Sequence, residues 1–238
     1  MATRTTGPAR ISQTAENYLL SLAILEEDGV RPHISELAAY LRRIPEAENI
    51  GATLASVSGM VQRMAKDGLL KVTREKRIEL TPVGLGRARD VVRRHRLAER
   101  LLVDVLDIPL QRAESEAHSL EHGISPALLQ RIEEKLGYPD FCPYGRPIYR
   151  ADETGLRQSE PDVMPLSEAE GGGSYVIIRI PDEDFPLLSY LVECDVLPGR
   201  EVVVEDIAAY RGVVDISRAG AKVSLGLDVA ARIRVRPA

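Results

Sequence analysis

Three of the four histidines of this chain fall in one stretch, His95 to His122, at helical spacings from carboxylates. His95 and Glu99 are four residues apart, so on a helix they share one face. After a break at Asp107–Pro109, a second helical run carries potential ligands at i, i+4, i+7 and i+8, namely Glu114, His118, Glu121 and His122. Imidazole and carboxylate together suit Mn, Fe, Co, Ni and Zn. The spacing therefore predicts a divalent metal held between two helices.

The competing interpretation is that both stripes are charged faces exposed to water. Apolar side chains interleave the stripes, for example Leu101 and Leu102 in the first and Ala117 in the second. Helices that are apolar to this degree are packed, and a packed carboxylate without a partner costs free energy. A metal is the simplest partner, so we favour the metal site.

The part of the chain before these stripes predicts three helices and a basic hairpin. Helical periodicity covers residues 14–27, 35–43 and 53–66, and alternation follows from 69 to 81 around the turn Thr73–Arg77. This order is typical of a winged helix-turn-helix, whose third helix enters the major groove of DNA. The cationic side chains expected to neutralise phosphates are Arg63, Lys66, Lys71, Arg74, Lys76 and Arg77. A plain amphipathic helix and a solvated basic turn are the alternative, which the helix count, the order and the hairpin disfavour together.

The remaining elements position the stripes and then change in type. A long helix from Pro82 to about Leu106 carries His95, and shorter helices follow at 110–123 and 126–137. Each short helix has one apolar stripe to bury against neighbours or a second protomer. The acidic, then glycine-rich stretch 151–173 is predicted to be a flexible linker. Short alternating segments from 174 to 238 predict a small β-barrel.

Composition limits the class of protein. The 238 residues suffice for two or three small domains, and no apolar run reaches the length of a membrane span. The net charge of −5 disfavours non-specific nucleic-acid binding by the whole surface but permits a locally basic element. Cys142 and Cys194 lie far apart in no metal-type spacing, and the N-terminus lacks the pattern of a secretory signal. We therefore expect a cytoplasmic protein without a membrane partner.

The segments RRHRLAERLLVDVL and EAHSLEHGIS resemble the metal-binding core of the diphtheria-toxin-repressor and manganese-transport-regulator family of metal-dependent transcriptional repressors. The resemblance implies a mainly α chain with a winged helix-turn-helix at 1–81 and a helical metal-binding and dimerisation domain at 82–150. Beyond the linker at 151–173, it implies an SH3-like barrel at 174–238, similar to the FeoA-type accessory domains of ferrous-iron transport. It further implies a homodimer that binds a palindromic operator in double-stranded DNA when metal is bound.

The same resemblance implies residue roles. One metal site matches His95, Glu99 and Glu114, and a neighbouring site matches His118, Glu121 and His122. Asn17 falls where the family has a further ligand to the second site, and Asp184 falls where long members send a carboxylate from the barrel. The family's other barrel ligand falls on Leu187, which cannot bind metal. Bases would be read by Ser56, Ser58 and Gly59 of the third helix, and Thr53 at its start would also contact DNA.

The predicted ligand set contains no cysteine or methionine, which favours Mn²⁺ or Fe²⁺ over Cu⁺. We expect Mn²⁺, with Fe²⁺ as the alternative, and expect Zn²⁺, Co²⁺ or Cd²⁺ to bind in vitro. Asn17 and His118 are neutral where better-known members have other ligands, so affinity and selectivity should differ from theirs. An insertion at Arg43–Ala52 also departs from the family pattern.

A metallohydrolase that uses the same His/Glu cluster is the competing function. No nucleophile–base pair and no H-E-x-x-H motif occurs in the sequence. A hydrolase would have no use for the winged-helix pattern of 35–81. We therefore expect a DNA-binding regulator rather than an enzyme, with no small organic substrate.

Overall fold

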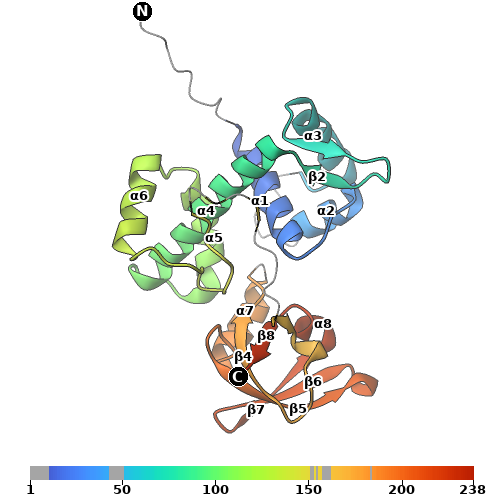
Figure 1. The fold of residues 1–238 in the computed structure, drawn as a ribbon, viewed down its shortest axis with the longest axis vertical. Helices are drawn as coiled ribbons and strands as arrows, with labels where there is room; N and C mark the ends of the chain where they lie inside the picture. The colour runs from blue at the N-terminus through green and yellow to red at the C-terminus, as the bar shows by residue number, and fades with distance from the viewer. Residues whose placement is uncertain (1–10, 43–50, 151–152, 154, 157–161, 183) are drawn as a thin grey trace, which may run out of the picture. The chain divides into compact units, whose positions relative to one another are not determined.

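The computed structural model describes residues 11–42, 51–150, 153, 155–156, 162–182 and 184–238 (Figure 1). These residues form two compact units. The first takes in the chain up to Val92 and a short piece around 153–156, and the second takes in the chain from Arg93 onward. Among the described helices, none combines the length and the apolar character that crossing a membrane requires.

The first unit contains three helices and a hairpin, as the sequence predicts. The elements are α1 (Gln13–Glu27), α2 (Ile34–Leu41), α3 (Leu54–Lys66), β1 (Leu70–Val72) and β2 (Ile78–Leu80), followed by the first turns of α4 (Pro82–Asp104) (Figure 1). Their apolar stripes meet in one core around Tyr18, Leu37 and Val61, each fully buried. The hairpin is antiparallel, with Lys71 opposite Glu79.

Helix starts in this unit differ in detail from the pattern. Helix α2 begins one residue before Ser35, because the Glu36 carboxylate accepts a 2.7 Å hydrogen bond from the backbone N–H of His33 and completes a capping box there. Leu54 is 57% exposed at the first position of α3, although the residue is apolar. The predicted insertion lies mostly outside the described residues.

Helix α4, which runs from the first unit into the second, and the two helices after it follow the predicted boundaries closely. Helix α4 is opened by Thr81, whose Oγ1 accepts a hydrogen bond from the Gly84 N–H at 3.0 Å. It ends before Asp107, which adopts a left-handed φ of 54°. Helices α5 (Leu110–Glu121) and α6 (Pro126–Lys135) follow, and the Arg93–Glu133 ion pair joins α4 to α6.

A six-stranded antiparallel sheet completes the second unit. Its order is β3-β8-β4-β5-β6-β7, with helices α7 (Phe185–Glu193) and α8 (Leu227–Ala230) between strands. The strands are β3 (Met164–Pro165), β4 (Ser174–Arg179), β5 (Glu201–Ala208), β6 (Val213–Arg218), β7 (Ala221–Gly226) and β8 (Arg234–Pro237). The sequence predicts a barrel, whereas within the described residues β3 and β7 are the two edge strands and do not pair with each other, so the sheet is not closed. The predicted linker contains β3, because Met164 pairs with Val235 of β8.

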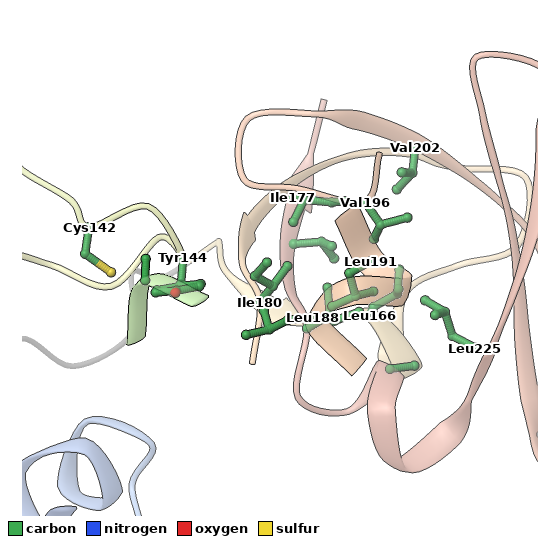
Figure 2. Close-up of a cluster of buried hydrophobic side chains, with 14 of the residues drawn as sticks. Cys142, Tyr144, Leu166, Ile177, Ile180, Leu188, Leu191, Val196, Val202 and Leu225 are labelled. Carbon is green, nitrogen blue, oxygen red and sulfur yellow. The ribbon is translucent and has the colours of Figure 1, made fainter. Parts of the chain in front are cut away.

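The loop after α6 packs onto this sheet. Figure 2 shows Cys142 and Tyr144 on the loop side of a buried apolar cluster, with Ile180 and Leu188 on the sheet side. The carbonyl of Tyr144 accepts a 3.0 Å hydrogen bond from the Ile180 N–H. Gly145 has φ of 89°, and a Cβ there would lie 1.9 Å from the Ile178 carbonyl oxygen. The close backbone approach therefore requires glycine.

Candidate metal centre

Helices α4 and α5 bring the predicted ligand stripes together. His95 and Glu99 lie on α4 with 4% and 1% of their surface exposed, and His118 and Glu121 lie on α5 with 4% and 0%. His122 is the C-cap residue of α5 and is half-buried. The helical spacing read from the sequence therefore delivers all five side chains to one buried region. An exposed charged face is excluded for them.

Glu121 lies between the two predicted groups. Its Oε2 is 2.8 Å from His95 Nδ1, and its Oε1 is 3.6 Å from His118 Nδ1 and 3.5 Å from His122 Nε2. His95 Nε2 in turn meets Glu99 Oε1 at 3.0 Å. Sequence reasoning assigned His95 and Glu121 to separate sites, whereas the fold places them in contact.

One subset already converges. Donor atoms of His95, His118 and Glu121 all lie within 4.8 Å of one another, and theirs is the one such group of histidine, cysteine and carboxylate side chains among the described residues. Within that described part of the chain, Glu121 Oε1 and Glu99 Oε2 are buried acceptors without a hydrogen bond. A buried carboxylate oxygen of this kind is expensive unless a cation satisfies it. Buried imidazoles beside such carboxylates fit a divalent transition metal.

The electrostatics of the metal-free centre depend above all on His95. Burial lowers the pKa of this imidazole, but the carboxylates of Glu99 and Glu121 outweigh burial and raise it well above its ordinary value. A protonated His95 thus neutralises the carboxylates when no metal is bound. A metal must displace that proton before His95 can act as a ligand.

Glu114 stands one turn before His118 on α5 and is half-buried. Burial, together with the carboxylates of Asp182, Glu99 and Glu121, raises the pKa of Glu114 to about 8 against the attraction of His95. It lies outside the converging subset. Glu114 therefore shares the electrostatic environment of the centre, but its carboxylate is held largely as the neutral acid at neutral pH.

The two remaining predicted ligands have different settings. Asn17 lies on α1 in the first unit, where its Oδ1 is buried and has no hydrogen-bond partner among the described residues. Asp184 caps α7, because its Oδ1 accepts a 3.1 Å hydrogen bond from the Leu187 N–H. In that segment the buried Asp182 is the acidic side chain that raises the pKa of Glu114. Its carboxylate accepts a hydrogen bond from Arg146 Nε at 2.9 Å.

Sequence reasoning missed Cys142 because it lies 43 positions after Glu99, outside any ligand spacing. In the fold the residue is 2% exposed. Burial, followed by the Glu99 carboxylate, raises the pKa of the Cys142 thiol well above its ordinary value. The missing signal was the docking of the 138–150 loop, which no local pattern reveals.

Some of the residues predicted to contact DNA are exposed, and others are bonded to groups within the protein. Thr53 caps α3 by accepting from the Ser56 N–H at 3.2 Å, and both side chains are exposed. Gly59 and Arg63 are exposed along the same helix, and Ser58 is half-buried. These positions leave the start of α3 accessible on one side.

The hairpin turn is closed by two backbone hydrogen bonds, from Thr73 N–H to Arg77 O at 2.9 Å and from Lys76 N–H to Thr73 O at 3.0 Å. Lys71 is engaged with Glu79 at 2.7 Å, and Arg77 donates to the carbonyl of Arg31 at 2.7 Å. Arg74 and Lys76 are exposed at the tip. The tip thus offers two cations to a polyanion.

Two protein-family models match the chain from residue 81 onward. The family model described as "Iron dependent repressor, metal binding and dimerisation domain" matches residues 81–150, which include α4, α5 and α6. The FeoA domain model matches residues 164–237, which include all six strands of the sheet.

Curated relatives extend the similarity over the whole chain. The diphtheria toxin repressor of Corynebacterium glutamicum is 35% identical over 229 residues, covering 93% of this chain and 95% of that protein. The iron-dependent repressor IdeR of Mycobacterium tuberculosis is 34% identical over 201 residues, covering 81% of this chain and 84% of that protein. A solved manganese-dependent transcriptional repressor in complex with manganese superposes with a TM-score of 0.79 at 28% identity, covering 94% of this chain and all of that one. These proteins are repressors, so the metallohydrolase alternative is set aside.

Proposed function

This chain belongs to the diphtheria-toxin-repressor family of metal-dependent transcriptional repressors, and from that premise we propose that it is a homodimer which binds a palindromic operator when Mn²⁺ occupies the centre between α4 and α5. The observation that carries the proposal is Glu121, a fully buried carboxylate that faces His95 with one oxygen and His118 and His122 with the other.

Two metal positions share that carboxylate in our proposal. His118, Glu121 and His122, completed by Asn17, form one, and His95, Glu99 and Glu114, with at most one carboxylate from Asp184, form the other. Mn²⁺ is preferred because the set is rich in oxygen and imidazole, and Fe²⁺ is the alternative. Relatives named for each metal support both choices.

Asn17 supplies the link from metal to DNA. It lies on α1 of the helix-turn-helix unit, at the position where the family resemblance implies a ligand. An amide oxygen is a neutral and weak ligand, so affinity rests mainly with the α5 residues. Its bond to the metal would restrict how the recognition helices are oriented, which is a coupling free energy between the two sites.

The rest of the proposal follows the family architecture. Residues 1–81 bind DNA, 82–150 bind metal and dimerise, and the sheet domain follows the linker. The bases are read by Ser56, Ser58 and Gly59 of α3, and Thr53 contacts DNA at the start of that helix. Phosphates are neutralised by Arg63 and the hairpin cations. The regulated genes are those of metal uptake, and the protein acts in the cytoplasm.

Metal-dependent operator binding tests the proposal. Fluorescence anisotropy with a palindromic promoter fragment should show binding with Mn²⁺ and little without it. Asn17→Ala should retain Mn²⁺ affinity, measured by calorimetry, with only a modest loss. The same variant should lose most of the metal dependence of DNA binding, a coupling typically of about 1–3 kcal/mol. DNA binding that is equally tight without metal would refute the repressor mechanism.

A further inference from the structure

The short segment 31–33, between α1 and α2, is bonded to the hairpin β1–β2. The Arg31 carbonyl accepts a hydrogen bond from the Arg77 guanidinium at 2.7 Å. The Pro32 carbonyl accepts one from the Ile78 N–H at 2.9 Å. The β2 side of the hairpin is therefore attached to this segment at two neighbouring positions.

His33 makes a third attachment, at the tip of the hairpin. Its Nδ1 lies 3.1 Å from the Lys76 carbonyl oxygen, and because a carbonyl oxygen can only accept, Nδ1 is the donor. The Lys76 N–H donates within the turn, to the Thr73 carbonyl at 3.0 Å. His33 thus satisfies, from outside the hairpin, the other backbone polar group of Lys76.

The backbone conformation of Lys76 makes this attachment important. Its φ of 61° lies in the left-handed region, which costs free energy for a residue that has a Cβ. Such a conformation persists only where surrounding contacts hold it. Lys76 and Arg74 are the two exposed cations of the hairpin tip. A contact that holds the Lys76 backbone therefore also determines where these cations lie.

His33 is itself held in place by helix α2. It is the N-cap residue of α2, and its N–H donates to Glu36 Oε2 at 2.7 Å. Its carbonyl accepts a hydrogen bond from the Leu37 N–H at 3.0 Å, and Leu37 is fully buried in the core that α2 shares with α3. The His33 imidazole therefore joins the hairpin tip to the core that carries the recognition helix.

We propose that His33 is a positioning residue for DNA binding, which holds the hairpin tip at a fixed place relative to α3 so that phosphates and bases are contacted together. The inference rests on the proposed function, in which Arg74 and Lys76 neutralise phosphates, and it adds a residue that acts through them. Phosphate contacts fix the orientation of a protein on the duplex. A tip that is already ordered loses less conformational entropy on binding than a mobile one. Removing the bond should therefore weaken binding to any DNA sequence.

Amide hydrogen exchange and anisotropy titrations of the full-length protein with Mn²⁺ test the inference. His33→Leu keeps a bulky side chain without a donor, so the Thr73 and Lys76 amides that close the turn should exchange faster. Its affinity for operator and random DNA should fall roughly two- to ten-fold, the range expected for one hydrogen bond. His33→Asn is the matched variant, because its amide N–H can replace the Nδ1 donor, and it should restore the slow exchange and most of the affinity. His33→Ala repeats the loss without the bulk of leucine.

A double-mutant cycle separates positioning of the tip from a direct DNA contact or a general loss of stability. In the Arg74→Ala/Lys76→Ala background, His33→Leu should cause no further loss of affinity, because the cations that the bond positions are gone. An equal loss in both backgrounds, unchanged exchange at the turn, or His33→Asn as weak as His33→Leu would overturn the role of His33 and leave DNA binding intact. If the wild type showed no Mn²⁺-dependent DNA binding, the proposed function would be overturned as well.

Discussion

Glu121 has a role that follows from two features of one side chain, its burial and its two oxygens. Helix α5 places it three residues after His118 and one before His122, and packing against α4 adds His95. Because the side chain is fully buried, its charge has to be compensated by these groups or by a metal. The burial and the neighbours of this one residue therefore give a physical reason for the proposed dependence on a metal.

Glu121→Gln should abolish high-affinity Mn²⁺ binding. The amide keeps the shape of the side chain but removes the charge that the two proposed metal positions share. We expect the affinity to fall by at least about 100-fold, since even residues that only support ligands change it by 10–100-fold. Titration calorimetry measures this. Glu116→Gln, on the exposed side of the same helix, is the control and should bind as wild type.

Glu114→Gln should stabilise the metal-free protein in a pH-dependent way. The folded pKa of about 8 lies above the ordinary 4.5, so the fold favours the protonated acid. Stability of the wild type therefore falls as pH rises from about 4.5 towards 8, and the glutamine variant is spared this loss. The gain should be near zero at about pH 4.5 and largest above about pH 8.

Urea denaturation of both proteins in chelator, at several pH values, checks this. His95 also has a raised pKa, so its contribution is likewise lost as pH rises. Because His95 attracts the Glu114 carboxylate, the difference between the two proteins includes this interaction. A pH-independent difference between the two proteins would contradict the electrostatic setting of Glu114.

At the scale of elements, the hairpin β1–β2 carries two kinds of cationic side chain. Some are held in contacts within the protein, and others are exposed and can contact DNA. Lys71 pairs with Glu79 across the strands, and Arg77 ties the hairpin to the carbonyl of Arg31. Arg74 and Lys76 project from the closed turn and are exposed. A short hairpin with a rigid base and a cationic tip is suited to contacting phosphates.

Replacing Arg74 and Lys76 together by alanine should weaken binding to operator and random DNA alike. The slope of log affinity against log salt should decrease by about one for each phosphate that the protein no longer neutralises. Anisotropy titrations across salt concentrations measure it, with Lys135→Ala on the exposed end of α6 as the control. A weakening restricted to operator DNA would instead indicate base reading by the hairpin.

At the scale of the whole molecule, the helical and sheet parts of the second unit are packed as one body. Apolar residues of the 138–150 loop and of the sheet share a core (Figure 2). The Arg146–Asp182 ion pair, with side chains 6% and 9% exposed, adds a buried polar interaction. Because Asp182 also acts on Glu114, the sheet domain contributes to the electrostatics of the metal centre.

Arg146→Ala should destabilise the second unit by roughly 3–5 kcal/mol, because it removes the cation that pairs with the buried Asp182 charge. Adding Asp182→Leu should restore much of that stability. The control is Arg150→Ala, which breaks an exposed pair with Asp140 and should cost no more than about 1 kcal/mol. Urea unfolding measures all three variants. Equal effects of Arg146→Ala and Arg150→Ala would show that the buried pair does not hold the domain.

The sequence by itself determined the features that depend on neighbours along the chain. Helical spacing identified the stripes of α4 and α5, and alternation around Thr73–Arg77 identified the hairpin. The family resemblance is confirmed by relatives that cover 93% of the chain. The predictions of the helices and of the hairpin succeeded because periodicity, caps and turns are set within a few residues.

Only the tertiary structure decided which distant groups meet. It placed His95 against Glu121, which the sequence had assigned to separate sites, and it packed the loop that carries Cys142 onto the sheet. It also paired Met164 with Val235, turning part of a predicted linker into a sheet edge. Such pairings depend on helix packing and on loops closing over tens of residues, and the free energy that selects them is shared across the whole core rather than written in any local pattern.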